Sequence, residues 1–274
     1  MSDYNNLNKL FDEILKSELF NQDYYEKQLN EKIDEDSLSH YLRIGYKKGF
    51  NPSKYFNSNF YLSEHEDVKN CGLNPLIHYF LFGKDQDFKI NPNINLNPVS
   101  TRVLTKDIYD NVVKSDSYYE CRWKYFNDII NELKKLKDCY NILEMGPFKL
   151  PLVKGEDVID LHDYTKSFPI KVNKLIKHNC ISVPYPIEDK EYDLVISCQV
   201  LEHLGIFGEQ KKIFDELERI SKKAIISLPY KWSVPHLRDH HMIDEKVISA
   251  WANGRKPSYQ HISGSRIIQI YDFD

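Results

Sequence analysis

The pattern of hydrophobic and polar residues breaks down between Ile90 and Pro98. Asparagine and proline interrupt this stretch, and neither a 3.6-residue nor a 2-residue apolar period survives in it. Apolar residues on both sides of the break recur at spacings typical of regular secondary structure. We therefore predict a helical domain over residues 1–95, a linker over 96–115 and a second domain over 116–274.

The segment before the break contains two similar stretches. His40-Tyr41-Leu42-Arg43-Ile44-Gly45 is followed 38 residues later by His78-Tyr79-Phe80-Leu81-Phe82-Gly83, and each unit ends in an Asn-Pro pair. This period, with short helical patterns closed by glycine, is typical of a helical repeat. We predict a small all-α domain with a leading helix over 7–20, in which His40 and His78 pack and hydrogen-bond rather than bind a metal.

Short apolar runs alternate with helical patterns in the remainder of the chain. Strand-like runs cover 140–145, 158–160, 192–197 and 224–228, helical patterns cover 116–137, 209–222 and 244–252, and a closing strand pair covers 258–263 and 266–273. Alternating strands and helices favour a parallel sheet with helices on its faces. The second domain is therefore predicted to be α/β.

Composition and charge narrow the class of protein. With 274 residues, 41% of them hydrophobic, the chain is long enough to bury a sizeable core. The 37 Lys and Arg against 41 Asp and Glu give a net charge of −4, which argues against nucleic-acid partners. The longest uncharged apolar stretch, 194–201, is far shorter than the roughly 20 residues of a membrane span. Without a signal-peptide pattern at the N-terminus, we expect a cytoplasmic protein.

The five cysteines are scattered singly, without a Cys-x-x-Cys pair, so neither a disulfide framework nor a zinc site is predicted. Candidate chemistry lies instead at the ends of the predicted strands. Gly146 follows the first strand, Asp160 ends the second, and Ser197 to Gln199 end a later one. Ligands of doubly wound sheets bind outside the carboxyl ends of the strands, so these residues should line one crevice. There, Gly146 would let the backbone approach a ligand, and the Asp160 carboxylate would accept both hydroxyls of a ribose.

Four motifs in this order resemble class I S-adenosylmethionine-dependent methyltransferases. They are Leu143-Glu144-Met145-Gly146-Pro147, Asp160 with Asp163, Tyr192-Asp193-Leu194-Val195, and Leu201-Glu202-His203. The resemblance covers about 116–274 and implies a Rossmann-like, mostly parallel sheet with an antiparallel last strand, and S-adenosylmethionine as cofactor. It implies cofactor-binding roles for Glu144, Gly146, Pro147, Asp160, Asp163, Asn179, Cys180, Ser197 and Gln199, with Asn179 and Cys180 near the adenine.

The loop after Gly146 departs from the family's glycine-rich pattern and fits a subset of the family with Leu-Glu-x-Gly-Pro. About a dozen residues separate the first two predicted strands, which is too few for a full crossover helix. A helix N-terminus to bind the cofactor's carboxylate is therefore in doubt at this position. Glu202 fits a structural role as well as cofactor contact.

The segment Pro235 to His241 concentrates three histidines and Arg238 after the last parallel strand. We predict that Tyr230, Trp232, His236 and Arg238 bind the methyl acceptor, and that His203, His240 or His241 acts as general base. Adjacent His240-His241 lacks the spacing of metal ligands, so no metal site is predicted. The alternative is that this segment is only exposed structure.

The N-terminal repeat is similar to a tandem His-Tyr-Leu-x-x-Gly repeat of bacterial surface-polysaccharide enzymes. This resemblance implies a sugar, sugar-phosphate or O-methyl phosphoramidate-type acceptor in capsule polysaccharide biosynthesis, and docking to other assembly enzymes. Two alternatives remain open. A non-catalytic scaffold is supported by the unusual loop after Gly146, whereas a nucleotide-sugar enzyme is disfavoured because 146–151 offers one glycine and two prolines to a diphosphate.

Overall fold

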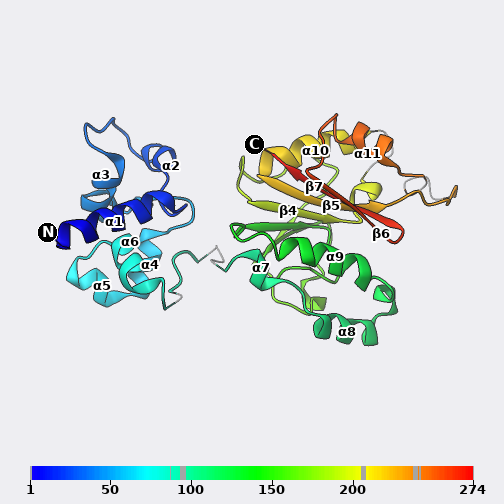
Figure 1. The fold of residues 1–274 in the computed structure, drawn as a ribbon, viewed down its shortest axis with the longest axis horizontal. Coiled ribbons are helices and arrows are strands. Elements are labelled where there is room, and N and C mark those ends of the chain that lie inside the picture. Colours follow the sequence, from blue (N-terminus) through cyan, green and yellow to red (C-terminus); the bar gives the residue numbers. More distant parts are fainter. Residues whose placement is uncertain are drawn as a thin grey trace. The chain divides into compact units, whose positions relative to one another are not determined.

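The computed structural model describes residues 2–86, 88–92, 97–204, 208–236, 240 and 242–273, and for residues 2–8 the backbone only. The chain forms two compact units, Met1–Leu96 and Asn97–Asp274 (Figure 1). Within the described ranges, no helix combines the length and the apolar character needed to cross a membrane. Each unit has a hydrophobic core of its own.

The predicted linker over 96–115 is wrong. Its residues form α7 (Val99–Arg102) and α8 (Lys106–Ser115), and they belong to the second unit. Val99, Leu104 and Tyr109 are buried in the core of that unit. The four-residue helix α7 is too short to show a period, and the apolar stripe of α8 is only two turns long.

The N-terminal unit is all α in the part that the structure describes. Its helices are α1 (Ser2–Lys16), α2 (Gln22–Glu26), α3 (Ser37–Arg43), α4 (Ser58–Glu64), α5 (Glu66–Cys71) and α6 (Pro75–His78), with a 3₁₀ helix η1 (Gly45–Lys48) and a π-helical turn η2 (Tyr79–Gly83). The side chains of Asn21 and Asn57 accept backbone N–H groups of the first turns of α2 and α4. These caps fix where both helices begin.

The two similar stretches make equivalent contacts. The Tyr25 hydroxyl is hydrogen-bonded to His40 Nδ1 at 2.6 Å, and the Tyr61 hydroxyl to His78 Nδ1 at 2.8 Å. A Cβ on Gly45 would collide with the Tyr25 ring, and a Cβ on Gly83 would lie 2.6 Å from the Tyr61 hydroxyl oxygen. Both histidines therefore hydrogen-bond within the fold, and both glycines make room for the tyrosines.

The described part of the second unit contains a seven-stranded sheet of order β3-β2-β1-β4-β5-β7-β6. The strands are β1 (Ile142–Met145), β2 (Asp157–Asp160), β3 (Lys174–Lys177), β4 (Leu194–Cys198), β5 (Lys223–Pro229), β6 (Tyr259–Ser263) and β7 (Arg266–Asp272). Neighbours from β3 to β5 are parallel, and β7 runs antiparallel to β5 and β6. The expected Rossmann-like sheet with an antiparallel last strand is confirmed.

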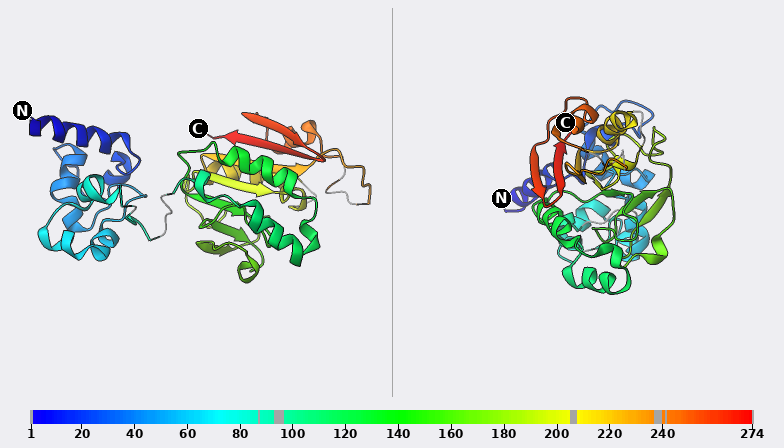
Figure 2. Two further views of the ribbon diagram at one scale, coloured as in Figure 1. Left: turned by 60° about the horizontal axis from the view of Figure 1, so that its bottom comes forward. Right: turned by 90° about the vertical axis from the view of Figure 1, so that its right-hand side faces the viewer.

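Helices cover both faces of this sheet (Figure 1 and Figure 2). On one face lie α7, α8 and α9 (Trp123–Leu133), and on the other lie α10 (Glu209–Ile220) and α11 (Glu245–Trp251). Alternate side chains of β4 point to opposite cores, Leu194 and Ile196 to one and Val195 to the other. This two-sided burial explains why the central strands are continuous apolar runs.

The connections at one end of the sheet contain no α-helix. Residues 146–156 join β1 to β2 as an irregular loop, and 161–173 join β2 to β3 with only a 3₁₀ turn, η4 (Thr165–Ser167). The sequence predicts about a dozen residues between the first two strands, too few for a crossover helix. The structure agrees, because 146–156 contain none. The edge strand β3 was not predicted, because its end residues Lys174 and Lys177 are exposed and its four residues show little apolar pattern.

Candidate functional site

The carboxyl ends of β1, β2 and β4 meet at one edge of the sheet. Met145 pairs with Ile159 of β2 and with Ser197 of β4. Because the strands are in register there, the residues that follow them emerge side by side. The Gly146 N–H donates to the Ile159 carbonyl at 2.9 Å, which continues the sheet one residue beyond β1.

Gly146 is required by its backbone and by a neighbour. Its φ is +57°, in the left-handed region that favours glycine, and a Cβ there would lie 3.1 Å from Val200 Cγ2. We predicted that Gly146 lets the backbone approach a ligand closely. In the structure, the close neighbour of Gly146 is Val200. Pro147 follows and is partly buried at the start of the loop.

Asp160 is a half-buried carboxylate at the end of β2. Its Oδ1 accepts the His162 N–H at 2.9 Å, and burial raises the pKa of its carboxyl. The Asp160 carbonyl accepts the His178 N–H at 3.0 Å, which brings the end of β3 alongside. Cys180 is buried here, and its pKa is raised to about 12 by burial and then by the charge of Asp160. Asn179 is exposed, and its Oδ1 accepts the Ile181 N–H at 3.1 Å.

Asp163 has different surroundings from Asp160. It is exposed, and its Oδ1 accepts both the N–H and the hydroxyl of Thr165, at 3.0 and 2.6 Å. These hydrogen bonds lower the pKa of the carboxyl. Its carboxylate thus caps the short turn η4, which makes Asp163 a matched comparison for Asp160.

Glu144 lies inside the protein rather than at the surface of the edge. Its side chain is fully buried, and Oε2 accepts the Leu152 N–H at 2.8 Å from the loop between β1 and β2. The buried Glu156 interacts with it, and burial raises the pKa of both carboxyls. The nearby Arg102 donates to the carbonyls of Tyr140 and Lys154. Glu144 therefore fixes the course of the loop that follows Gly146.

The ends of β4 and β5 are joined by side-chain contacts. Ser197 is fully buried, and its hydroxyl lies 3.8 Å from Met145 Sδ, so it does not face solvent at this edge. Gln199 has a φ of +58°, and its N–H donates to the Ser227 carbonyl at 2.8 Å. The Arg266 Nε donates to Gln199 Oε1 at 3.2 Å.

A group of aromatic, cationic and imidazole side chains surrounds Arg266. Its guanidinium lies 4.7 Å from the Tyr125 ring centre and 5.3 Å from that of Trp232. The Trp232 ring stacks on His240 at 6.1 Å, and His240 in turn lies 4.5 Å from the His203 ring. We call this group the acceptor-side cluster; it consists of Arg122, Tyr125, Glu202, His203, Trp232, His240 and Arg266.

Charge in the acceptor-side cluster is mixed. Burial lowers the pKa of Arg266, the charge of Arg122 lowers it further, and Glu202 acts in the opposite direction. Arg122 stacks on Tyr118 with its guanidinium 4.0 Å from the ring centre. Two guanidinium groups and one buried carboxylate thus act on the same small region, which suits a polar or anionic ligand.

The other predicted acceptor residues have varied surroundings. The Tyr230 hydroxyl donates to Glu245 of α11, whereas Trp232 Nε1 donates to the Ser265 carbonyl at 2.7 Å. His236 is exposed. Arg238 and His241 lie outside the described residues.

Arg266 is a residue that the sequence argument missed. It is the first residue of β7 and pairs with Pro229, the last residue of β5. Because β7 is antiparallel, its beginning lies at the carboxyl edge of the parallel strands. The expected antiparallel last strand already predicts that the first residue of that strand lies at this edge.

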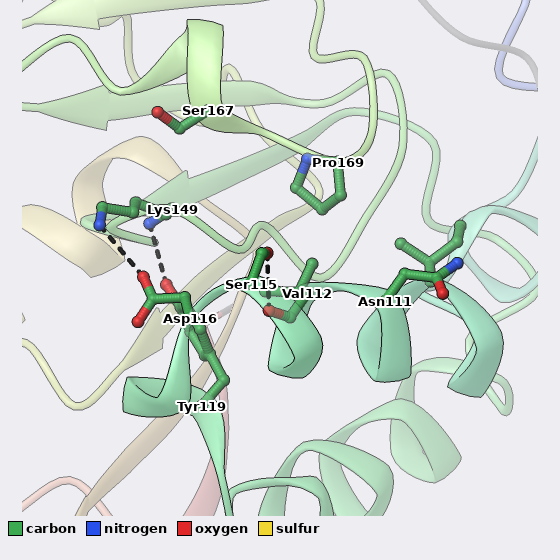
Figure 3. A pocket seen from close by; sticks show the side chains of 9 residues that line it. Asn111, Val112, Ser115, Asp116, Tyr119, Lys149, Ser167 and Pro169 are labelled. Carbon is green, nitrogen blue, oxygen red and sulfur yellow. Dashed lines mark hydrogen bonds and ion pairs between the residues drawn. The ribbon is translucent and has the colours of Figure 1, made fainter.

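A pocket of about 480 Å³ opens between α8 and the loops that follow β1 and β2 (Figure 3). Lys149 lines it, and its Nζ is turned toward Asp116, 3.1 Å from Oδ2, while its backbone N–H donates to the Tyr119 hydroxyl oxygen. The sequence argument named none of its lining residues, which are Ile108, Asn111, Val112, Ser115, Asp116, Tyr119, Lys149, Ser167 and Pro169. Most of these lining residues lie in or directly after the segment 96–115, which was predicted to be a linker.

No protein-family model and no curated protein sequence matches this chain. Among solved structures, it is similar to a SAM-dependent methyltransferase from Aquifex aeolicus, with 12% identity over 61% of this chain and 98% of that one and a TM-score of 0.44. A TehB-like SAM-dependent methyltransferase from Corynebacterium glutamicum gives 9% identity over 62% and 100%, with a TM-score of 0.42. The N-methyltransferase NodS from Bradyrhizobium japonicum, in complex with S-adenosyl-L-homocysteine, gives 12% over 48% and 77%, with a TM-score of 0.37. These likenesses are remote, and the fold is established by the strand order of this chain itself.

Proposed function

We propose that the second unit binds S-adenosylmethionine and catalyses transfer of its methyl group to an oxygen of a sugar-like or anionic acceptor. One observation carries the proposal. The half-buried Asp160 carboxylate ends β2 at the same sheet edge at which, two to four strands away, the residues of the acceptor-side cluster lie. A nucleoside site and a polar acceptor site side by side are what such a transfer requires.

The residues at the β1–β2 half of the edge fit a nucleoside cofactor. Asp160 offers a carboxylate to two ribose hydroxyls, and the buried, protonated Cys180 beside it offers a weakly polar surface to a base. Glu144 contributes indirectly, since it holds Leu152 and with it the loop after Gly146. When bound, S-adenosylmethionine supplies an electrophilic methyl group on its sulfonium sulfur.

The acceptor-side cluster supports a polar acceptor. Guanidinium groups donate paired hydrogen bonds to phosphate or carboxylate oxygens, and Trp232, which packs on both Arg266 and His240, holds these two groups beside the ligand. A neutral imidazole can accept the proton of a hydroxyl group, which suits His203 and His240 as the general base for a hydroxyl acceptor. We also propose acceptor binding for Arg238 and a general-base role for His241, because both are sequence neighbours of His240.

The proposed setting is surface-polysaccharide assembly in a bacterium, with a sugar hydroxyl or a phosphoramidate-type oxygen as acceptor. It is supported by the repeated tyrosine–histidine pairs of the N-terminal unit, which match the repeat that resembles those of polysaccharide enzymes. Under this proposal the N-terminal unit docks to other enzymes of the assembly, and the second unit performs the chemistry in the cytoplasm.

Calorimetric titration of the full chain with S-adenosylhomocysteine tests the proposal. Asp160→Ala removes charge-assisted hydrogen bonds of about 1.5–3 kcal/mol, so its affinity should fall about tenfold or more. Asp163→Ala, three residues away and exposed, should bind as the wild type does.

A wild-type chain that fails to bind S-adenosylhomocysteine would contradict the enzyme and favour the scaffold. Binding of NAD or a nucleotide sugar instead would favour the nucleotide-sugar enzyme. If Asp163→Ala weakens binding and Asp160→Ala does not, the ribose contact belongs to Asp163.

A further inference from the structure

We infer that Glu202, His203 and His240 form a site for one divalent transition-metal ion at the acceptor side of the sheet edge. One potential ligand atom from each residue lies within 4.8 Å of the other two. Glu202 is 1% exposed, His240 is half-buried and His203 is exposed. The three donors therefore lie between the protein interior and solvent, where an ion can enter and still keep open coordination positions.

The sheet explains why these residues meet. Glu202 and His203 lie in η5 (Leu201–His203), a single 3₁₀ turn that follows β4, and His240 belongs to the loop that follows β5. Because β4 and β5 are parallel neighbours, both loops leave the same edge. The sequence argument considered only ligand spacing along the chain around His240-His241, so it predicted no metal.

The donor set suits zinc, cobalt, iron or manganese rather than calcium or magnesium. Two imidazoles with one carboxylate are a ligand set of catalytic zinc and of non-haem iron sites, which keep positions open for water or substrate. Zinc takes such nitrogen and oxygen donors at about 2.0–2.2 Å. Donor atoms that lie within 4.8 Å of one another are close enough for small side-chain rotations to bring all three to one ion.

The surroundings of the three residues support an ion. Trp232 stacks on His240 with an angle of 21° between the rings, and Arg266 stacks on Trp232, so the orientation of His240 is fixed from outside. Stacking of this kind limits rotation of the imidazole ring and so holds its nitrogen atoms in place. The charge of Arg266 acts on the buried Glu202 carboxylate, and a bound cation would act on it in the same direction.

This site deepens the proposed function and, for its role in catalysis, rests on it. A divalent ion with one carboxylate and two neutral imidazoles carries a net charge of +1, which attracts an oxygen anion to an open position. A bound metal also lowers the pKa of a coordinated hydroxyl, and with His203 and His240 as its ligands this activation takes the place of the general-base role proposed for them above. The acceptor class is then one with an oxygen able to ligate the ion, such as a sugar hydroxyl or a phosphoryl or phosphoramidate oxygen.

Metal binding is tested on the full chain after removal of metal with a chelator. Titration with Co²⁺, followed by its visible absorption and by calorimetry, should show one ion per chain, and Zn²⁺ should displace it. His203→Asn and Glu202→Gln should each weaken binding by at least about tenfold. His261→Asn is the matched control, because His261 is an exposed histidine on β6 paired with Asp128, and it should bind one ion like the wild type.

Two outcomes would overturn the site: a wild-type chain without bound Co²⁺, or variants of both Glu202 and His203 that bind it like the His261→Asn control. His203 is exposed, so His203→Asn keeps the test valid if Glu202→Gln does not fold. Titration with S-adenosylhomocysteine in the presence of chelator separates this inference from the proposed function. Cofactor binding without Co²⁺ binding refutes only the metal site, and Co²⁺ binding without cofactor binding refutes only the transferase.

Discussion

The two halves of the carboxyl edge are held together in different ways. At β1 and β2, buried or half-buried carboxylates accept backbone N–H groups, Glu144 from Leu152 and Asp160 from His162. At β4, β5 and β7, side chains from a strand and from the segment after β5 stack on one another, with Arg266 and Trp232 at the centre. Buried carboxylates that accept backbone N–H groups distinguish the first half, and stacking between side chains distinguishes the second.

This difference bears on function. Carboxylate-to-backbone hydrogen bonds span a few residues and give a rigid loop, as a site for an invariant cofactor requires. Stacked aromatic and cationic side chains contribute to ligand binding through their surface area and their charge. One substitution among them therefore changes ligand recognition without altering the backbone. We therefore expect variants of the first half to affect stability and cofactor binding, and variants of the second half to affect the acceptor.

The largest expected effect is at Glu144. Glu144→Ala leaves the buried Leu152 N–H without its acceptor and opens a cavity, so the free energy of unfolding should fall by about 3 kcal/mol. Binding of S-adenosylhomocysteine should weaken as well, because the loop after Gly146 loses its support. Urea unfolding and calorimetry measure the two effects. Glu144→Gln retains an acceptor oxygen and should lose less stability; equal losses in both variants would show that the hydrogen bond to Leu152 is unimportant.

The second expected effect is a pH dependence in the same half. Burial raises the pKa of Glu156 well above its usual value and that of Glu144 from 4.5 to about 7. Between pH 4.5 and about 7, the folded state thus binds more protons than the unfolded state. The contribution of these carboxyls to the free energy of unfolding is therefore fully present below about pH 4.5 and is lost as pH rises through the pKa of the folded state. The loss corresponds to about 3 kcal/mol by pH 8.

Glu156→Gln imitates the protonated carboxyl and removes one of the two titrating groups. The free energy of unfolding of this variant, measured by urea at several pH values from 5 to 8, should vary less than half as much as that of the wild type. Parallel pH profiles of the wild type and the variant would mean that the pKa of Glu156 is not raised in the folded state.

The third expected effect concerns only the second half of the edge, at β4, β5 and β7. Arg266→Ala removes a partly buried guanidinium, so affinity for a sugar phosphate should fall about tenfold, with glucose 1-phosphate as the probe in NMR binding experiments. Affinity for S-adenosylhomocysteine should stay unchanged. Arg43→Ala, an exposed arginine of the N-terminal unit, is the control. If Arg266→Ala weakens the cofactor and spares the probe, the division of the edge into two halves is wrong.

The smallest expected effect is that of removing the N-terminal unit. The two units have separate hydrophobic cores, so a chain of residues 97–274 should fold and bind S-adenosylhomocysteine within about twofold of the full chain. Circular dichroism and calorimetry measure this. A fragment that is unfolded or does not bind would make the N-terminal unit part of the enzyme and remove the basis for a docking role.

The sequence by itself determined the elements that have a local pattern. Apolar runs revealed the four central parallel strands, because burial on both faces of a sheet makes a strand continuously apolar. The repeated His-Tyr and Gly positions indicated two equivalent units, and the tyrosine–histidine hydrogen bonds are equivalent in both. Gly146 and Asp160 were found at the sheet edge because their positions follow directly from the ends of β1 and β2.

Only the tertiary structure decided what depends on contacts between distant segments. Helices α7 and α8 are part of the second unit since Val99 and Tyr109 pack into its core, whereas the sequence was interpreted as a linker there because its apolar patterns are short. Arg266 reaches the acceptor side because β7 inserts antiparallel beside β5, and His240 meets Glu202 because β4 and β5 are neighbours. Strand order and register fix these contacts, and no period along the chain encodes them.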